Sequence, residues 1–215
     1  MKTSKISLKK RKVRSFMLAF EKKDKTEEEI EDELTTTGME YIQMKLPVVK
    51  ITPEFEEMLT EKVEHNILRA KIREAKVEDL DSVAVLYNRS WLTSSTPYSM
   101  ITIESLKTIL GYPETKILIA RVYGSDAAFV ILDYEGLKNE YGIIAGLGVI
   151  PRFQRKGLGT VIGMTAWNYF KKKGVKELRC EVYKDNVVSY NFIKSIGFEE
   201  FARKVYKSED FDIDS

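Results

Sequence analysis

The chain has 215 residues, of which 43% are hydrophobic and 32% charged, a composition that excludes disordered and fibrous proteins. The 35 basic residues nearly balance the 33 acidic ones, so the net charge of +2 does not indicate a nucleic-acid-binding protein. No run approaches the roughly 20 apolar residues that span a bilayer, and the single cysteine, Cys180, excludes an internal disulfide and a multi-cysteine metal site. We therefore expect a soluble, cytoplasmic protein with no membrane partner and no metal.

The N-terminal part of the chain is dense in charge. Residues 1–14 carry seven Lys or Arg and no acid. The five apolar residues at 16–20 are too few for the core of a secretory signal, which needs about 7–15. Seven cations could neutralise several phosphates, but basic runs of this kind are usually solvated tails. We do not expect nucleic acid to be a partner.

Three local patterns predict structure in residues 1–68. Thr26-Glu27-Glu28-Glu29 matches a capping box at the start of a short acidic helix. Residues 39–50 are strand-like, and Pro47 favours an edge position. Thr52-Pro53 predicts the N-cap and first position of a second helix. We expect residues 1–68 to form a small N-terminal α/β appendage, a basic tail followed by short elements, packed on the main domain or on a second subunit of a homodimer.

Residues 69–215 alternate between strand-like and helix-like patterns and predict one α/β domain. Apolar runs at 117–123 and 127–134 are separated by Gly124-Ser125-Asp126, which is a hairpin signal. The other expected elements are strands over 70–74, 141–149, 177–183 and 200–206, and helices from about 77, over 103–110, 157–172 and 186–195.

The stretch from Gly146 to Thr160 combines a strand, a tight basic loop and a helix start. Free backbone N–H groups and the positive end of the helix dipole make such a start an anion site. Gly157 and Gly159 let phosphate oxygens approach the backbone, and Arg155 and Lys156 add positive charge. The loop predicts phosphate binding; the alternative is a turn whose two glycines have no function.

Two other phosphate motifs fit this loop poorly. The segment Gly157-Leu158-Gly159-Thr160-Val161-Ile162-Gly163 has one residue too many for a dinucleotide fingerprint, and a hairpin precedes it where a first βαβ unit would be needed. Only 56 residues follow Gly159, too few for the remaining strands of that fold. The P-loop fails as well, because the chain has no Gly-Lys-Ser/Thr.

Two segments together resemble a known family. Val149-x-Pro151-x-x-Gln154-x-x-Gly157-x-Gly159 resembles the acetyl-CoA loop of the GNAT acetyltransferase superfamily. About 30 residues later, the segment from Asn186 to Phe198 looks like the family's Asn-x-x-Ala-x-x-Leu-Tyr-x-x-x-Gly-Phe. The order of elements over 69–206 is also similar. The resemblance implies a mixed, mostly antiparallel central sheet flanked by helices, with residues 69–215 as a GNAT-like acyl-CoA-binding domain and residues 1–68 as the appendage.

The resemblance also implies roles for particular residues. The loop should hold the coenzyme A pyrophosphate, the strand before it should pair with the pantetheine arm, and the last helix should lie beside that arm. The implied cofactor-binding residues are Gln154, Arg155, Lys156, Gly157, Leu158, Gly159 and Thr160 in the loop, Leu147, Gly148 and Val149 on the strand, and Asn186, Ser189 and Phe192 on the helix.

The chain departs from the family pattern at the position of the general acid. Many members have a tyrosine there, which protonates the leaving thiolate, whereas this chain has Ile193. Tyr190 is one helical turn earlier, on nearly the same face. It could replace the phenol as a catalytic acid or simply pack.

The general base is also not evident. Some members carry a Glu on the strand before the loop, but residues 143–146 contain no acid. Glu140 at the start of that strand and Glu181 on the neighbouring strand could act through a water, or could be surface acids. A lysine acceptor has a pKa of about 10.4 and an α-amine about 7.8. A weak base therefore favours a low-pKa amine or a water-relayed proton.

The acceptor site is the least defined part. The loop over 91–100 stands where relatives frame the acceptor, and Trp91 and Tyr98 could line a pocket or only pack. The sequence predicts an N-acetyltransferase that moves an acetyl group from acetyl-CoA to a primary amine, on a small molecule or peptide, by direct attack in a ternary complex. The alternative is a non-catalytic acyl-CoA-binding or regulatory module, because of Ile193 and the acid-free strand.

Overall fold

The structure is a computed structural model and describes residues 38–65, 68–91 and 102–206; the helix expected at Thr26 lies outside these ranges. The elements in chain order are β1 (Met39–Pro47), α3 (Pro53–Glu64), β2 (Lys71–Glu74), α4 (Leu80–Trp91), α5 (Ile103–Leu110), β3 (Lys116–Val122), β4 (Ser125–Glu135), β5 (Tyr141–Val149), α6 (Leu158–Lys172), β6 (Glu177–Tyr183), α7 (Val187–Ser195) and β7 (Glu199–Tyr206). These bounds agree closely with the expected elements in the described ranges.

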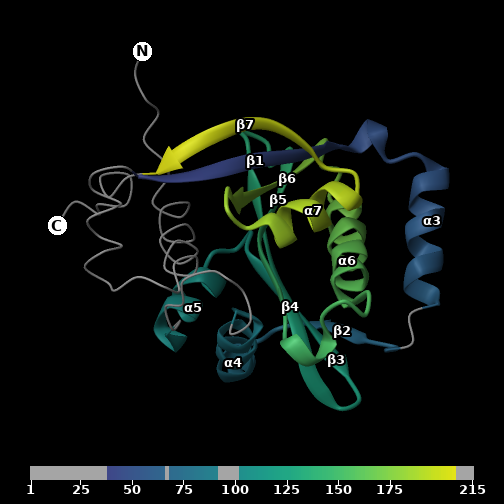
Figure 1. Cartoon of the computed structure of the whole chain (residues 1–215). Helices are drawn as coiled ribbons and strands as arrows, with labels where there is room; N and C mark the ends of the chain where they lie inside the picture. The colour runs from purple at the N-terminus through teal and green to yellow at the C-terminus, as the bar shows by residue number, and fades with distance from the viewer. Residues whose placement is uncertain (1–37, 66–67, 92–101, 207–215) are drawn as a thin grey trace.

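One seven-stranded sheet organises the described residues, with the order β2-β3-β4-β5-β6-β1-β7. Every neighbouring pair is antiparallel except β5 and β6, which are parallel. Helices α4 and α5 pack on one face, and α6, α7 and α3 lie on the other (Figure 1). This confirms the predicted mixed, mostly antiparallel sheet flanked by helices.

The central strands are buried on both faces because helices cover both. On β4, Val130 and Leu132 belong to the core under α6, while Phe129 and Ile131 belong to the core under α4 and α5. Successive side chains of a strand point to opposite faces, so a strand covered on both faces needs an unbroken apolar run. The run over 127–132 supplies it.

The position of β1 corrects one expectation. The strand is not at an edge: it lies between β6 and β7. Pro47 is tolerated because it is the last residue of the strand, opposite Glu177, and pairing with β7 already ends at Lys45. Its missing N–H is therefore not needed by the β7 ladder. The N-terminal part thus contributes a strand to the common sheet, and a domain boundary at residue 68 stays a prediction.

Helix α3 begins as its sequence predicts. The hydroxyl of Thr52 accepts a hydrogen bond from the N–H of Phe55 at 3.2 Å, and Pro53 follows at the first helical position. The helix packs on α6, where Lys171 binds Glu56 at 2.8 Å.

None of the described helices is long and apolar enough to cross a membrane.

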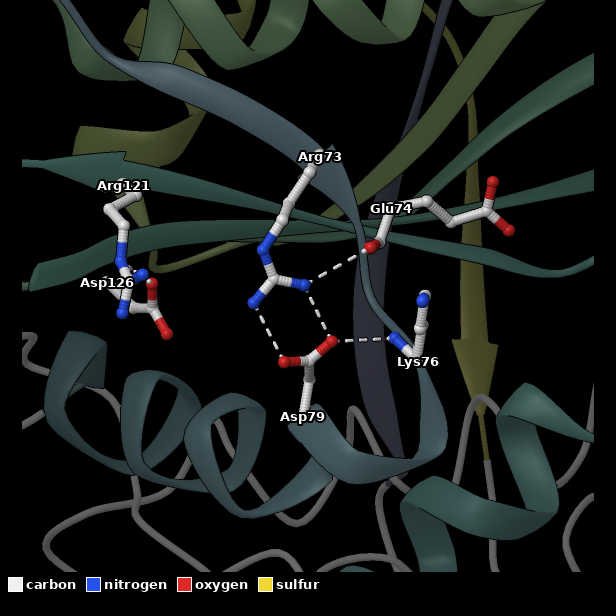
Figure 2. A network of polar contacts seen from close by, with 6 residues as sticks. All are labelled: Arg73, Glu74, Lys76, Asp79, Arg121 and Asp126. Atoms are coloured by element: carbon white, nitrogen blue, oxygen red, sulfur yellow. Dashed lines mark hydrogen bonds and ion pairs between the residues drawn. The ribbon is translucent and has the colours of Figure 1, made fainter. Parts of the chain in front are cut away.

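An ion pair fixes the connection from β2 to α4. Arg73 on β2 donates two hydrogen bonds to Asp79, at 2.6 and 2.7 Å, and the N–H of Lys76 donates to the same carboxylate at 2.8 Å (Figure 2). These bonds, with the guanidinium of Arg73 as the largest contribution, lower the pKa of Asp79 to about 2. The ionised carboxylate therefore holds the turn that leads into α4.

Replacing Asp79 with Asn should destabilise the fold in a pH-dependent way. The Arg73 side chain is 44% exposed, so solvent screens the pair, and we expect a loss of about 1 kcal/mol in the free energy of unfolding. Because the folded pKa of Asp79 is depressed, this stabilisation is complete above the ordinary value of 3.8 and is lost as the pH falls through about 2.

Urea unfolding at pH 7 and at pH 3 measures this effect. The difference between wild type and Asp79→Asn should shrink at the lower pH. The exposed neighbour Glu78 provides a control of equal charge change, since Glu78→Gln should alter stability little. A difference between wild type and Asp79→Asn that is equal at both pH values would contradict the assignment.

Candidate functional site

The site is built where the two parallel strands separate. Strands β5 and β6 pair over three positions only, Tyr141 with Glu177, Gly142 with Leu178 and Ile143 with Arg179. The register between β4 and β5 also shifts here, because Leu132 faces Ile144 and Ile131 faces Gly146. Residue 145 is thus the extra residue of a bulge, a feature that bends a strand. Past Ile143, β5 pairs with β4 alone among the described strands.

A cleft of about 140 Å³ occupies the gap between these strands. Its walls come from β5, β6, α6 and α7, and from the N-terminal residues of β1 and α3. The residues of β5 and β6 that line it are Ile144, Ala145, Gly146, Leu147, Leu178, Cys180, Glu181 and Val182; those of α6 and α7 include Thr160, Gly163, Met164, Trp167, Asn186, Ser189, Phe192 and Ile193.

The basic loop stands at the open end of β5, before α6. Gly157 is the N-cap of α6, has φ of 78°, and provides no side-chain cap. The first intrahelical bond runs from the N–H of Val161 to the carbonyl of Gly157 at 3.1 Å, so the amides of residues 158–160 precede it as in every helix start. Arg155 and Lys156 are exposed beside these amides. The arrangement can bind an anion through backbone N–H groups, the helix dipole and two cations.

The side-chain amide of Gln154 binds two backbone carbonyls. It donates to the carbonyl of Val149 at 2.8 Å and to the carbonyl of Ser90 at 3.3 Å. It therefore ties the loop to the end of β5 and to α4. Gly148 is buried between Phe129 and Ser90, where an added Cβ would lie 2.5 Å from the Phe129 ring.

Helix α7 covers the cleft from the other side. The side chain of Asn186 caps it by accepting from the N–H of Ser189 at 3.1 Å. The ring of Phe192 packs against Gly159, where an added Cβ would lie 3.1 Å from the ring. The structure therefore brings the predicted helix residues Asn186, Ser189 and Phe192 to the same cleft as Leu147 and Thr160.

Two of the predicted catalytic candidates, Tyr190 and Glu140, are not among the residues that line the cleft, and the side chains of the predicted acceptor residues lie outside the described part of the chain. The hydroxyl of Tyr190 donates to Glu200 of β7 at 3.5 Å. Glu140 lies in the turn between β4 and β5, where it accepts from the N–H of Lys138 at 2.8 Å, and backbone amides lower its pKa. Trp91 ends α4, but its side chain, like Tyr98, lies outside the described residues.

Glu181 is the acidic residue that the structure places between two cavities. It lines the cleft, and it also lines a cavity of about 300 Å³ with Gln43, Glu135, Arg179, Arg203 and Lys204. On β6, Leu178 and Val182 belong to the core under α6, so Arg179 and Glu181 alternate to the opposite face of the sheet. Glu181 therefore connects the cleft with a polar cavity on the face away from α6.

The partner of Glu181 was not foreseen from the sequence. Tyr206, the last described residue of β7, donates its hydroxyl to both carboxylate oxygens of Glu181, at 3.0 and 2.9 Å. Its ring is fully buried against Tyr41. An aromatic residue at the end of the last strand is the only signal in the sequence, and it does not identify the partner.

The family comparison matches the part of the chain that contains this site. The model of the Acetyltransferase (GNAT) family matches residues 80–198, which is more than half of the chain. The match covers β5, the basic loop, α6, β6 and α7, but it leaves out β1, α3 and β7.

Similar proteins share this region. Aminoglycoside N(6')-acetyltransferase type 1 of Acinetobacter haemolyticus is 25% identical over 150 residues, which are 66% of this chain and 99% of that protein. An uncharacterised N-acetyltransferase of Methanocaldococcus jannaschii is 26% identical over 144 residues, and the match spans 63% of this chain and 64% of the relative.

Solved structures have the same fold. An AAC(6')-Iy enzyme bound to a bisubstrate analogue of coenzyme A superposes with a TM-score of 0.54 at 19% identity, over 64% of this chain and 96% of that one. The ribosomal-protein-S18-alanine N-acetyltransferase of Escherichia coli superposes with a TM-score of 0.52 at 22% identity, over 62% of this chain and 79% of that one.

Proposed function

Because the chain belongs to the acetyltransferase (GNAT) family of N-acetyltransferases, we propose that it transfers an acyl group from acyl-CoA, with acetyl-CoA as the reference donor, to a primary amine by direct attack in a ternary complex. The observation that carries this proposal is the cleft between β5 and β6, which connects the anion-binding loop with Glu181. No step requires a covalent enzyme intermediate or a metal.

The residues present suit a coenzyme A donor. The amides at the start of α6, with Arg155 and Lys156, form the pyrophosphate site. The peptide groups of β5 from Ile144 to Leu147 have no β6 partner in the described ladder and are available to a pantetheine arm, which would lie as an added strand. The bound donor supplies an activated acyl carbon, and the chain's own part is to hold and orient it.

Glu181 is proposed as the general base. The amine nitrogen forms a bond to the acyl carbon as the bond from carbon to sulfur breaks, so an amide and free coenzyme A result. The proton lost by the amine passes to Glu181, directly or through a water, and the leaving sulfur takes a proton from solvent. Glu181 suits this task because it faces both the cleft and the polar cavity from which an amine would come.

Binding and turnover assays distinguish an acyltransferase from a non-catalytic acyl-CoA-binding module. Calorimetry should show coenzyme A binding, and a panel of α-amines, lysine peptides and aminoglycosides should reveal an acceptor. Absence of coenzyme binding would refute the proposal. Binding with no turnover on the whole panel would support the non-catalytic module, which the placement of Ile193 at the cleft and of Tyr190 beside Glu200 favours.

Arg155 should matter for binding and little for folding. It has φ of 56°, a left-handed conformation that side chains adopt at a cost of roughly 1 kcal/mol and that Asn tolerates better. Arg155→Asn should keep the thermal midpoint or raise it slightly. It should weaken coenzyme A binding about fivefold, because an exposed charge contact contributes about 1 kcal/mol. The loss should diminish at higher salt. A variant that binds as wild type would exclude Arg155 from the pyrophosphate site.

Tyr206 is proposed as a positioning residue for Glu181. Tyr206→Phe retains the buried ring and removes the hydrogen bonds to the carboxylate. A hydrogen bond to a charged group contributes about 1.5 kcal/mol, so kcat should fall about tenfold while KM for the amine stays nearly constant. Steady-state kinetics give both constants. Equal kcat in the variant and the wild type would show that Glu181 needs no orientation.

A further inference from the structure

The cleft continues beyond the strands as an apolar chamber, by which we mean the space lined by Leu46, Phe55, Leu59, Trp167, Ile196 and Phe198. All six belong to the hydrophobic core cluster under α6 or pack against it. Thr160, at the start of α6, and Trp167, about two turns further along the helix, line the same cleft. The chamber is therefore at the end of the cleft away from the proposed phosphate site, where the acyl group of a donor anchored there would lie.

Half of the chamber comes from residues outside the family match. Leu46 ends β1, and Phe55 and Leu59 lie on α3, whereas the match begins at residue 80. Helix α3 packs on α6, and the edge of the Phe55 ring approaches Gly197 so closely that an added Cβ there would be 3.0 Å away. The N-terminal part thus encloses a space that the matched region alone would leave open.

Space in the chamber begins at Gly163. This residue lines the cleft, and a Cβ built on it would have no heavy atom within 4 Å. From Gly163 to Trp167 the helix advances about 6 Å at 1.5 Å per residue, which is room for several methylene groups. Ile193 of α7 also lines the cleft, where a phenol would add a polar group.

An ion pair borders the chamber beside Trp167. Glu56, which also lines the cleft, accepts two hydrogen bonds from the ammonium of Lys171, at 2.8 and 2.9 Å. The same ammonium lies 5.9 Å from the centre of the Trp167 ring. This pair sets a boundary to the apolar space, so the chamber is of limited depth.

We infer that the apolar chamber holds the alkyl chain of the donor, so that the preferred acyl-CoA carries a chain longer than acetyl. The inference rests on the proposed function, since it requires coenzyme A in the cleft. The reaction balances as before: the longer acyl carbon exchanges its bond to sulfur for a bond to the amine nitrogen. Burial of each further methylene should tighten binding about two- to fourfold until the chamber is filled.

The test measures affinity without turnover. Coenzyme A and its S-methyl, S-butyl, S-hexyl and S-octyl thioethers are titrated calorimetrically into the full chain. Gly163→Leu fills the first part of the chamber from a helix position that has no conformational need for glycine. Asn168→Leu, an exposed position of α6, is the matched control with the same added side chain. Thermal unfolding verifies that both variants fold.

Wild type and Asn168→Leu should bind the S-butyl or S-hexyl thioether at least tenfold more tightly than the S-methyl thioether. Gly163→Leu should lose this gain, so that the longer thioethers bind it no more tightly than the S-methyl thioether does. Equal or weaker binding of the longer chains would overturn the inference and leave the proposed function standing. Loss of all coenzyme binding in Gly163→Leu would also overturn it, since the space would then belong to the coenzyme itself. A wild type that binds none of these compounds would refute the proposed function as well.

Discussion

Replacement of Glu181 by Gln is expected to lower kcat for acyl transfer by about 10²- to 10⁴-fold, the usual contribution of a general base. The amide keeps the shape of the side chain and can still accept from Tyr206, so the buried ring cluster on that face is preserved. Calorimetric affinity for coenzyme A should stay within a factor of about two to three, because the variant changes no group at the loop. We therefore expect a variant that binds coenzyme A normally but has a very low kcat.

Glu140 provides the matched control for this experiment. It was the other acid predicted near the site, and it lies in the turn before β5, bound to the N–H of Lys138. Glu140→Gln should therefore leave kcat within about threefold of wild type. If Glu140→Gln were the slow variant and Glu181→Gln the active one, the assignment of the base would be reversed.

The second large effect is expected at Gly157. Alanine there must adopt φ near 78°, which costs roughly 1–2 kcal/mol, and its methyl group enters the space where phosphate oxygens approach the amides of α6. We expect Gly157→Ala to weaken coenzyme A binding at least about 30-fold, since roughly 2 kcal/mol of phosphate contact would be lost. Calorimetry with coenzyme A measures this directly.

A variant at Gly174 distinguishes the effect of backbone strain from the loss of phosphate contacts. It follows the other end of α6, has φ of 69°, and an added Cβ there meets no atom within 4 Å. Gly174→Ala should therefore show a comparable loss of stability with unchanged coenzyme affinity. Equal losses of affinity in both variants would mean that the loop acts only through the stability of the fold.

Local chemistry explains why so much of the fold was predictable. The alternation and length of the apolar runs predicted the strands, Thr52-Pro53 predicted the start of α3, and Gly157 predicted the start of α6. That Leu147, Thr160 and Asn186 would lie together was predictable too, because they belong to motifs with fixed spacing, and all three line the cleft.

Long-range pairing explains what was missed. Nothing local to residues 39–47 shows that β1 inserts between β6 and β7, since that depends on partners at least 130 residues away. Pro47 was misleading for the same reason. The contact between Tyr206 and Glu181 depends on that same insertion, because β1 lies between β6 and β7 and the contact spans it. Tyr190 was a reasonable candidate by helical spacing, but whether its hydroxyl faces the cleft or β7 depends on the orientation of α7.

The most direct test of the whole account is a crystal structure of the chain with acetyl-CoA. We predict the pyrophosphate on the amides of residues 157–160, the pantetheine arm along β5 between Ile144 and Leu147, and the acyl carbon within reach of Glu181, directly or through one water. Coenzyme bound elsewhere, or an acyl carbon turned away from Glu181 with no water between them, would contradict the account.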